Sequence, residues 1–90
     1  MSKTPRLFLH VLNTATPLAC GALVPKRFAK RAVDRNALKR MFREACRHQT
    51  VYTQGRLLIR LVKPAGQVHP QNRADWWNEI EQLFNVQSKA

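Results

Sequence analysis

Features that mark several protein classes are missing from these 90 residues. No stretch of about 18 apolar residues occurs, and the first six residues are not followed by the apolar core of a signal peptide. The sequence therefore predicts neither a membrane-spanning helix nor a secretory signal, and we expect a soluble, cytoplasmic protein. Hydrophobic residues still make up 44% of the chain, which is enough for a globular fold rather than wholesale disorder.

The sequence also lacks the spacings of metal and catalytic sites. Cys20 and Cys46 are 26 residues apart, with no CxxC pair and no histidine at metal-ligand spacing. The three histidines lie in unrelated segments, away from any nucleophile or carboxylate. We expect two reduced thiols, no catalytic residue, no metal ligands and no cofactor bound tightly by the protein.

Acidic residues are scarce as well. Lysine and arginine number 16 against 5 aspartates and glutamates, which gives a net charge of +11. Residues 1–63 carry +12 and residues 64–90 carry −1. A charge of this size opposes folding unless a polyanion relieves it, so one part of the molecule is predicted to face nucleic acid or an anionic membrane.

Hydrophobic periodicity predicts one α+β domain over residues 1–90. We expect strands at 6–12 and 18–24, paired as an antiparallel hairpin across a turn at 13–17. Asp34 is the predicted N-cap of a helix ending near His48, a third strand spans 56–63, and Asn72 caps a last helix. Residues 1–5 and 87–90 are expected to form tails. Such elements favour a two-layer sandwich with the helices on one face of a small sheet.

The first predicted helix separates apolar residues from basic ones. Its apolar side gathers Leu38, Met41, Phe42, Ala45 and Cys46, and its opposite side gathers Arg35, Asn36, Lys39, Arg40, Arg43 and Arg47. Residues 26–47 hold nine cations against two acids, so pairing within the helix cannot explain them. Several of the cations also crowd the helix N-terminus, where the helix dipole disfavours positive charge. A merely solvated face is the alternative, and these details favour RNA binding instead.

Residues 26–44 carry a recognisable pattern. A basic turn is followed on the helix by Ala-Val-x-Arg-Asn-x-x-Lys-Arg-x-x-Arg-Glu. This segment resembles the signature of the bacterial ribonuclease P protein component, the protein subunit of a ribonucleoprotein nuclease. The resemblance implies a strand–helix–strand crossover with the rare left-handed sense, as in the second domain of a ribosomal small-subunit protein. It also implies that the subunit assists an RNA enzyme that removes the 5′ leader from precursor tRNA, with catalysis and Mg²⁺ held mainly by the RNA.

The resemblance assigns site residues as well. Those expected from it to contact the catalytic RNA are Lys26, Arg27, Lys30, Arg31, Arg35, Asn36, Lys39, Arg40 and Arg43, and the basic side of the helix adds Arg47. On the sheet, Phe8, His10 and Arg60 are candidates for binding the single-stranded leader. The alternative is that Phe8 lies in the core and His10 is merely exposed. The helical spacing of Trp76, Trp77, Ile80 and Phe84 predicts core positions rather than stacking platforms.

One departure from the family pattern affects the expected function. Relatives usually begin with an additional helix and strand that help to form the leader cleft, and this chain begins almost at its first predicted strand. The expected partners are the catalytic RNA and precursor tRNA, with no obligate protein partner and no membrane. The alternative is a general RNA-binding module, or a shortened variant without processing activity. A membrane-surface helix is disfavoured, because the arginines sit in a folded context.

Overall fold

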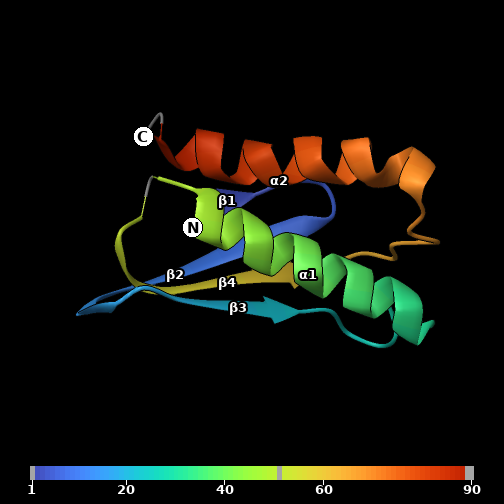
Figure 1. The fold of residues 1–90 in the computed structure, drawn as a ribbon, viewed down its shortest axis with the longest axis horizontal. Helices are drawn as coiled ribbons and strands as arrows, with labels where there is room; N and C mark the ends of the chain where they lie inside the picture. The colour runs from blue at the N-terminus through green and yellow to red at the C-terminus, as the bar shows by residue number, and fades with distance from the viewer. Residues whose placement is uncertain (1, 51, 89–90) are drawn as a thin grey trace.

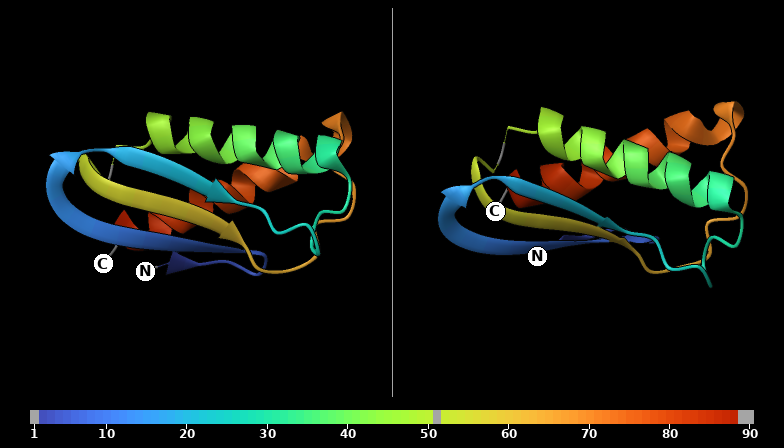
Figure 2. Two further views of the ribbon diagram at one scale, coloured as in Figure 1. Left: turned by 90° about the horizontal axis from the view of Figure 1, so that it is seen from below. Right: turned by 60° about the horizontal axis from the view of Figure 1, so that its bottom comes forward.

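Two helices and a four-stranded sheet make up the fold in the computed structural model, which describes residues 2–50 and 52–88 (Figure 1). The strands are β1 (Ser2–Lys3), β2 (Leu7–Pro17), β3 (Ala19–Leu23) and β4 (Gln54–Leu61). Helix α1 spans Ala32–His48, and a 3-10 turn (Pro70–Asn72) leads into α2 (Arg73–Ser88). Both helices cover the same face of the sheet, which leaves the other face open (Figure 2).

The strand order is β1-β2-β4-β3. Strand β4 is antiparallel to β2 and parallel to β3, and α1 makes the connection between the two parallel strands. Seen from the open face, with the helices behind the sheet, the β3–α1–β4 connection is left-handed (Figure 2). About 98% of such connections are right-handed. The predicted two-layer α+β sandwich and its unusual crossover are therefore both confirmed.

The predicted hairpin is wrong. Strands β2 and β3 do not pair with each other in the described chain, because β4 lies between them and bonds to both. Residues 13–17 continue β2 as extended chain, and Pro17 is aligned with Gln54 at the start of β4. Strand β4 has apolar residues on both faces around Leu57, Leu58 and Ile59, and this composition suits a central strand.

Several predicted boundaries also differ from the structure. The expected N-terminal tail contains β1, which pairs with β2, and the third strand runs over 54–61 rather than 56–63. Helix α2 extends to Ser88, so of the predicted C-terminal tail only residues 89–90 lie outside the described residues. Helix α1 begins at Ala32, which places Asp34 inside the first turn and not at the N-cap. Asn72 precedes α2 as predicted, but its side chain is used elsewhere. Its amide oxygen accepts from the His69 N–H, and its amide nitrogen donates to the Gln67 carbonyl.

Alternation along the strands builds the core. Leu7 and Leu9 of β2, with Leu57, Ile59 and Leu61 of β4, are fully or almost fully buried beneath the helices. Helix α1 adds Leu38, Met41, Phe42 and Cys46, and α2 adds Trp76, Ile80, Leu83 and Phe84. Burying such side chains stabilises the fold by about 1.5–3 kcal/mol each. The predicted apolar face of α1 is confirmed.

Helix α2 is fastened to the first strands by a buried carboxylate. Glu79 accepts hydrogen bonds from the Thr4 hydroxyl (2.6 Å), the Arg6 backbone N–H (2.8 Å) and the Arg6 Nε (2.7 Å). The Arg6 guanidinium also lies 3.6 Å from the centre of the Trp76 ring. Arg6 therefore has a structural role and is not part of a free cationic surface.

The two cysteines form a disulfide, which contradicts the predicted reduced thiols. The fold places β3 against the C-terminal half of α1, and the Cα atoms of Cys20 and Cys46 are 6.1 Å apart. This separation lies within the range of about 4.4–6.8 Å that disulfides require. Sequence spacing alone could not show that the two residues meet across these layers.

Candidate nucleic-acid interface

The exposed side of α1 carries a row of cations. One side of the helix is committed to the core through Leu38 and Phe42, so residues on the opposite side must face solvent. The residues there are Asn36, Lys39, Arg40, Arg43 and Arg47. In the part of the chain that the structure describes, none of the four cations in this set forms an ion pair. Their positive charge is therefore available to a partner.

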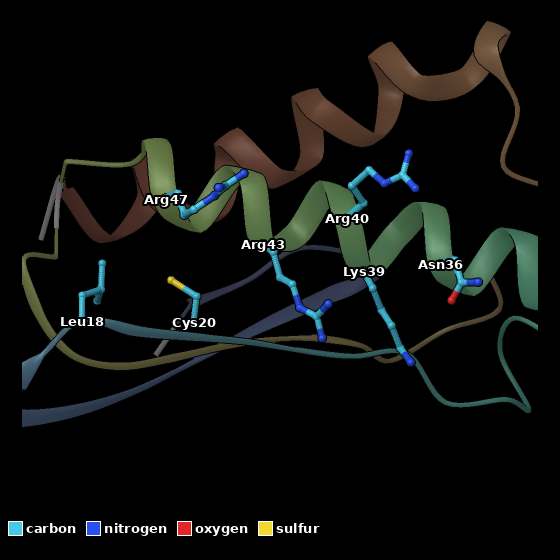
Figure 3. Close-up of a pocket in the computed structure, with 7 residues that line it drawn as sticks. All are labelled: Leu18, Cys20, Asn36, Lys39, Arg40, Arg43 and Arg47. Carbon is cyan, nitrogen blue, oxygen red and sulfur yellow. The ribbon is translucent and has the colours of Figure 1, made fainter.

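These residues line a groove between α1 and β3, here called the α1–β3 groove. It has a volume of about 670 Å³, and Leu18 and Cys20 contribute its other wall. Lys39 and Arg43 extend from the helix toward β3, whereas Arg40 extends from the helix toward α2 (Figure 3). Since β3 is an edge strand, the groove is open along one side of the sheet. An elongated anion can therefore lie along it.

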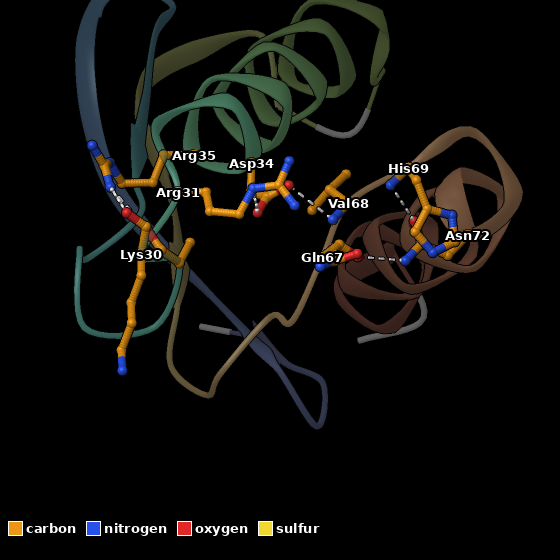
Figure 4. A network of polar contacts seen from close by, with 9 residues as sticks. Lys30, Arg31, Asp34, Arg35, Gln67, Val68, His69 and Asn72 are labelled. Carbon is orange, nitrogen blue, oxygen red and sulfur yellow. Dashed lines mark hydrogen bonds and ion pairs between the residues drawn. The ribbon is translucent and has the colours of Figure 1, made fainter.

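The basic turn before α1 contributes four further exposed cations: Lys26, Arg27, Lys30 and Arg31. Its backbone is held by hydrogen bonds from the N–H groups of Phe28 and Ala29 to the Pro25 carbonyl. Arg35 braces the same turn, since its Nη1 donates to the carbonyls of Ala29 (3.0 Å) and Lys30 (2.9 Å) (Figure 4). We had predicted Arg35 only as an RNA contact, and its guanidinium has this structural role as well.

Asp34 fixes the position of the loop that follows β4. Its Oδ1 accepts a hydrogen bond from the Val68 N–H (3.0 Å), and its Oδ2 lies 3.5 Å from Arg31 Nε (Figure 4). The carboxylate is almost completely buried at 2% exposure. Asp34 therefore joins the start of α1 to residues 64–72, and it partly neutralises only one of the cations in the basic turn.

The open face of the sheet brings the predicted leader residues together. Phe8 and Arg60 are direct partners across β2 and β4, and His10 is two residues along on the same face. The rings of Phe8 and His10 are 4.5 Å apart, and the Arg60 guanidinium lies 5.7 Å from the centre of the Phe8 ring. The alternative that Phe8 lies in the helix-covered core is excluded by this register.

Two polar atoms on this sheet face are buried without a partner in the described chain: His10 Nε2 and Arg60 Nε. Burial, and to a lesser degree the nearby Arg60, lowers the pKa of His10 below its ordinary 6.5. The imidazole is therefore neutral at pH 7, and the guanidinium supplies the positive charge. A ligand that accepts hydrogen bonds would satisfy Arg60 Nε, and it would satisfy His10 Nε2 in the tautomer that carries its proton on that nitrogen.

Sequence reasoning missed two cations of the same face. Lys3 is aligned with Phe8, and Arg56 with Leu12, so both lie on the open side. The four-residue spacing between Arg56 and Arg60 places them on the same face of a strand and could have identified the first. Strand β1 has only two residues, and such a short segment gives no periodic signal for Lys3.

The core positions predicted for the apolar residues of α2 are largely confirmed. Trp76, Ile80 and Phe84 are buried, whereas Trp77 is only partly buried. No three His, Cys, Asp or Glu side chains within the described ranges lie close enough together to hold a metal ion. Neither described helix is long and apolar enough to cross a membrane.

Comparison with known proteins identifies a family. The family model described as Ribonuclease P matches residues 2–87. The chain is also similar to the ribonuclease P protein component of Nitrosococcus oceani, with 40% identity over 52 residues. This alignment covers 58% of the chain and 44% of the relative, so the match spans less than half of that protein's length. No solved structure matches the chain.

Proposed function

The chain belongs to the ribonuclease P protein family, and from this premise we propose that it is the protein subunit of a tRNA-processing ribonucleoprotein nuclease. Its partner is the catalytic RNA, and its substrate is precursor tRNA. The observation that carries the proposal is the row of unpaired cations on α1, which lines the α1–β3 groove. Arginine forks and lysine ammonium groups at this density match the phosphates of a folded RNA.

The proposal assigns the chemistry to the RNA. The described side chains include no cluster that could hold a metal ion, and the Thr4 hydroxyl that contacts the Glu79 carboxylate is buried in the fold, so the role we assign to the protein is binding and charge neutralisation. Mg²⁺ would be held mainly by RNA phosphates in a holoenzyme of this kind. We place the assembly in the cytoplasm, where its substrate would be made.

We further propose that the open sheet face holds the single-stranded leader. Phe8 offers a stacking surface, Arg60 a cation, and His10 a neutral imidazole with an unsatisfied nitrogen. Lys3 and Arg56 extend the positive charge across the sheet. Aromatic rings beside cations are typical of surfaces that bind single strands.

Reconstitution tests the proposal. A bacterial catalytic RNA should cleave precursor tRNA at low magnesium faster with this protein than without it, because the protein supplies part of the required positive charge. Lack of stimulation would contradict the proposed subunit role. Equal affinity for the catalytic RNA and for unrelated structured RNAs, with a steep dependence on salt, would instead indicate a general RNA-binding module.

A further inference from the structure

A second groove lies on the other side of α1, between α1 and α2, and is called here the α1–α2 groove. Its volume is about 520 Å³, within the range of about 300–1,000 Å³ typical of small-ligand sites. Its lining includes Val33, Arg40, Glu44, Arg73 and Trp77. The two helices are joined to different parts of the sheet and have few contacts with each other, which leaves this space between them.

Trp77 gives the α1–α2 groove an aromatic wall. The preceding Trp76 is fully buried against the sheet, and one step along a helix turns the next side chain by about 100°. Trp77 is therefore directed away from the centre of the core, where it is only partly buried and lines the groove. We had predicted both tryptophans as core residues, and the second retains an accessible indole surface.

Two cations line the same groove as this indole. Arg40 and Arg73 are exposed, and neither forms an ion pair or hydrogen bond with the residues that the structure describes. Arg40 extends from α1 toward α2 (Figure 3). Glu44 lies along the same groove, with a carboxylate oxygen 4.0 Å from His48 Nε2. An aromatic surface that shares a groove with two exposed guanidinium groups is complementary to an anionic ligand that carries flat rings.

We propose that the α1–α2 groove binds one unpaired base of an RNA strand. The base stacks on Trp77, and Arg40 and Arg73 bind the phosphates on either side. Arg40 also lines the α1–β3 groove, so one RNA can contact α1 on both flanks. This inference rests only on the RNA-binding part of the proposed function, and not on tRNA processing.

Indole fluorescence tests the stacking. The full chain is titrated with single-stranded oligoadenylate and with an abasic oligomer of the same length. Oligoadenylate should quench the emission, because a stacked base contacts Trp77, and the abasic oligomer should bind without quenching. Trp77→Phe retains Trp76 and should lose the quenching. Equal quenching by the abasic oligomer, or unchanged quenching in Trp77→Phe, would overturn the proposal.

Affinity measurements supply the second test. The affinities are measured in the Phe8→Leu background, which removes the stacking ring of the open sheet face. There Trp77→Leu keeps an apolar side chain without an aromatic ring and should weaken oligoadenylate binding about tenfold, or about 1.4 kcal/mol. Trp77→Phe should stay within about threefold of the parent protein, since a phenyl ring still stacks. Arg73→Ala should weaken binding more than Lys63→Ala, a matched removal of an exposed cation outside both grooves. Thermal melting of each variant confirms that it is folded.

Two results would count against the groove as an RNA site. The first is unchanged oligoadenylate affinity when Trp77→Leu is added to Phe8→Leu and the protein remains folded. The second is a dimer in the absence of RNA that Trp77→Leu abolishes, because the α1–α2 groove would then be a self-association surface. Failure to stimulate the catalytic RNA would contradict the proposed function alone, since the oligoadenylate measurements do not depend on it.

Discussion

The α1–β3 groove and the open sheet face both present positive charge, but the chemistry around that charge differs. Along α1 the cations are mostly exposed, and the described groove contains no aromatic side chain. On the sheet, Phe8 and a neutral His10 lie beside the half-buried Arg60. The first surface suits phosphates at any sequence, and the second suits the bases of a single strand.

The comparison shows how a small chain can present two cationic surfaces of different chemistry. One helix face must be buried, so its opposite face can carry charge at little structural cost. One sheet face is covered by helices, so the other is free to expose rings and cations at two-residue spacing. Changes that act on one surface and spare the other therefore test the division directly.

The largest expected effect is loss of the fold, which would abolish both surfaces at once. Phe42→Ala deletes a fully buried ring beneath α1 and should lower the free energy of unfolding by about 3–5 kcal/mol. In a domain of this size that loss can prevent folding. Urea denaturation measures it, and Leu23→Ala on the exposed face of β3 is the control with a small expected effect. A Phe42→Ala protein with unchanged stability would contradict the core assignment.

Loss of the disulfide should rank next. Opening the Cys20–Cys46 bond with a dithiol should lower the free energy of unfolding by about 3 kcal/mol, as expected for a closed loop of this length. The α1–β3 groove should loosen, because the bond joins its two walls, whereas the sheet face should keep its affinity for single strands. The double variant Cys20→Ala/Cys46→Ala is the control and should not respond to reductant.

Arg43→Ala should weaken RNA binding at the α1–β3 groove and leave the open sheet face unchanged. It removes a cation that extends toward β3 without disturbing the core, so the melting temperature should stay unchanged. Affinity for catalytic RNA should fall, and the slope of log affinity against log salt should shrink by about 1. Equal losses of stability and affinity would show that Arg43 is structural.

Phe8→Leu should impair the open sheet face and leave the α1–β3 groove intact. The variant keeps an apolar side chain on the sheet but loses the ring that faces His10 and Arg60. Binding of precursor tRNA with a leader should weaken by about tenfold, the effect of losing roughly one stacked base. Mature tRNA and catalytic RNA should bind as before, and an equal loss for all three RNAs would contradict a leader site.

The smallest expected effect is a dependence on pH. The pKa of His10 is lowered in the folded protein, so the unfolded chain binds a proton more readily. The free energy of unfolding should therefore fall as the pH drops through 6.5 toward 5, and it should be restored above 7. His10→Gln should flatten this part of the profile in denaturation experiments. An unchanged profile would show that the environment of His10 does not disfavour its charged form.

Local patterns explain most of what could be predicted. The 3.6-residue period of α1 identified its core side and its basic side, and the two-residue period of β2 placed Phe8 and His10 on one face. The pairing of strands that are distant in the sequence was harder to predict. The central position of β4 depends on long-range contacts, and turn-like composition at 13–17 concealed an extended segment.

Tertiary contacts also changed the role of individual residues. Asp34 has a side chain suited to an N-cap, but the Val68 N–H uses its carboxylate instead. Cys20 and Cys46 meet only because β3 passes along α1. The accessible side of Trp77 depends on the separation of two helices, which no local period encodes.

The position of β4 also determines the order in which the elements can fold during translation. Hydrogen bonds within α1 are local, so this helix can form as soon as residues 32–48 have been synthesised. Strand β3 has no strand partner until β4 emerges, and β2 has only its short pairing with β1. The nascent chain thus presents its cationic helix before its sheet can close. A polyanion that neutralises the helix at that stage would relieve the repulsion among its cations and so favour compaction once β4 has emerged.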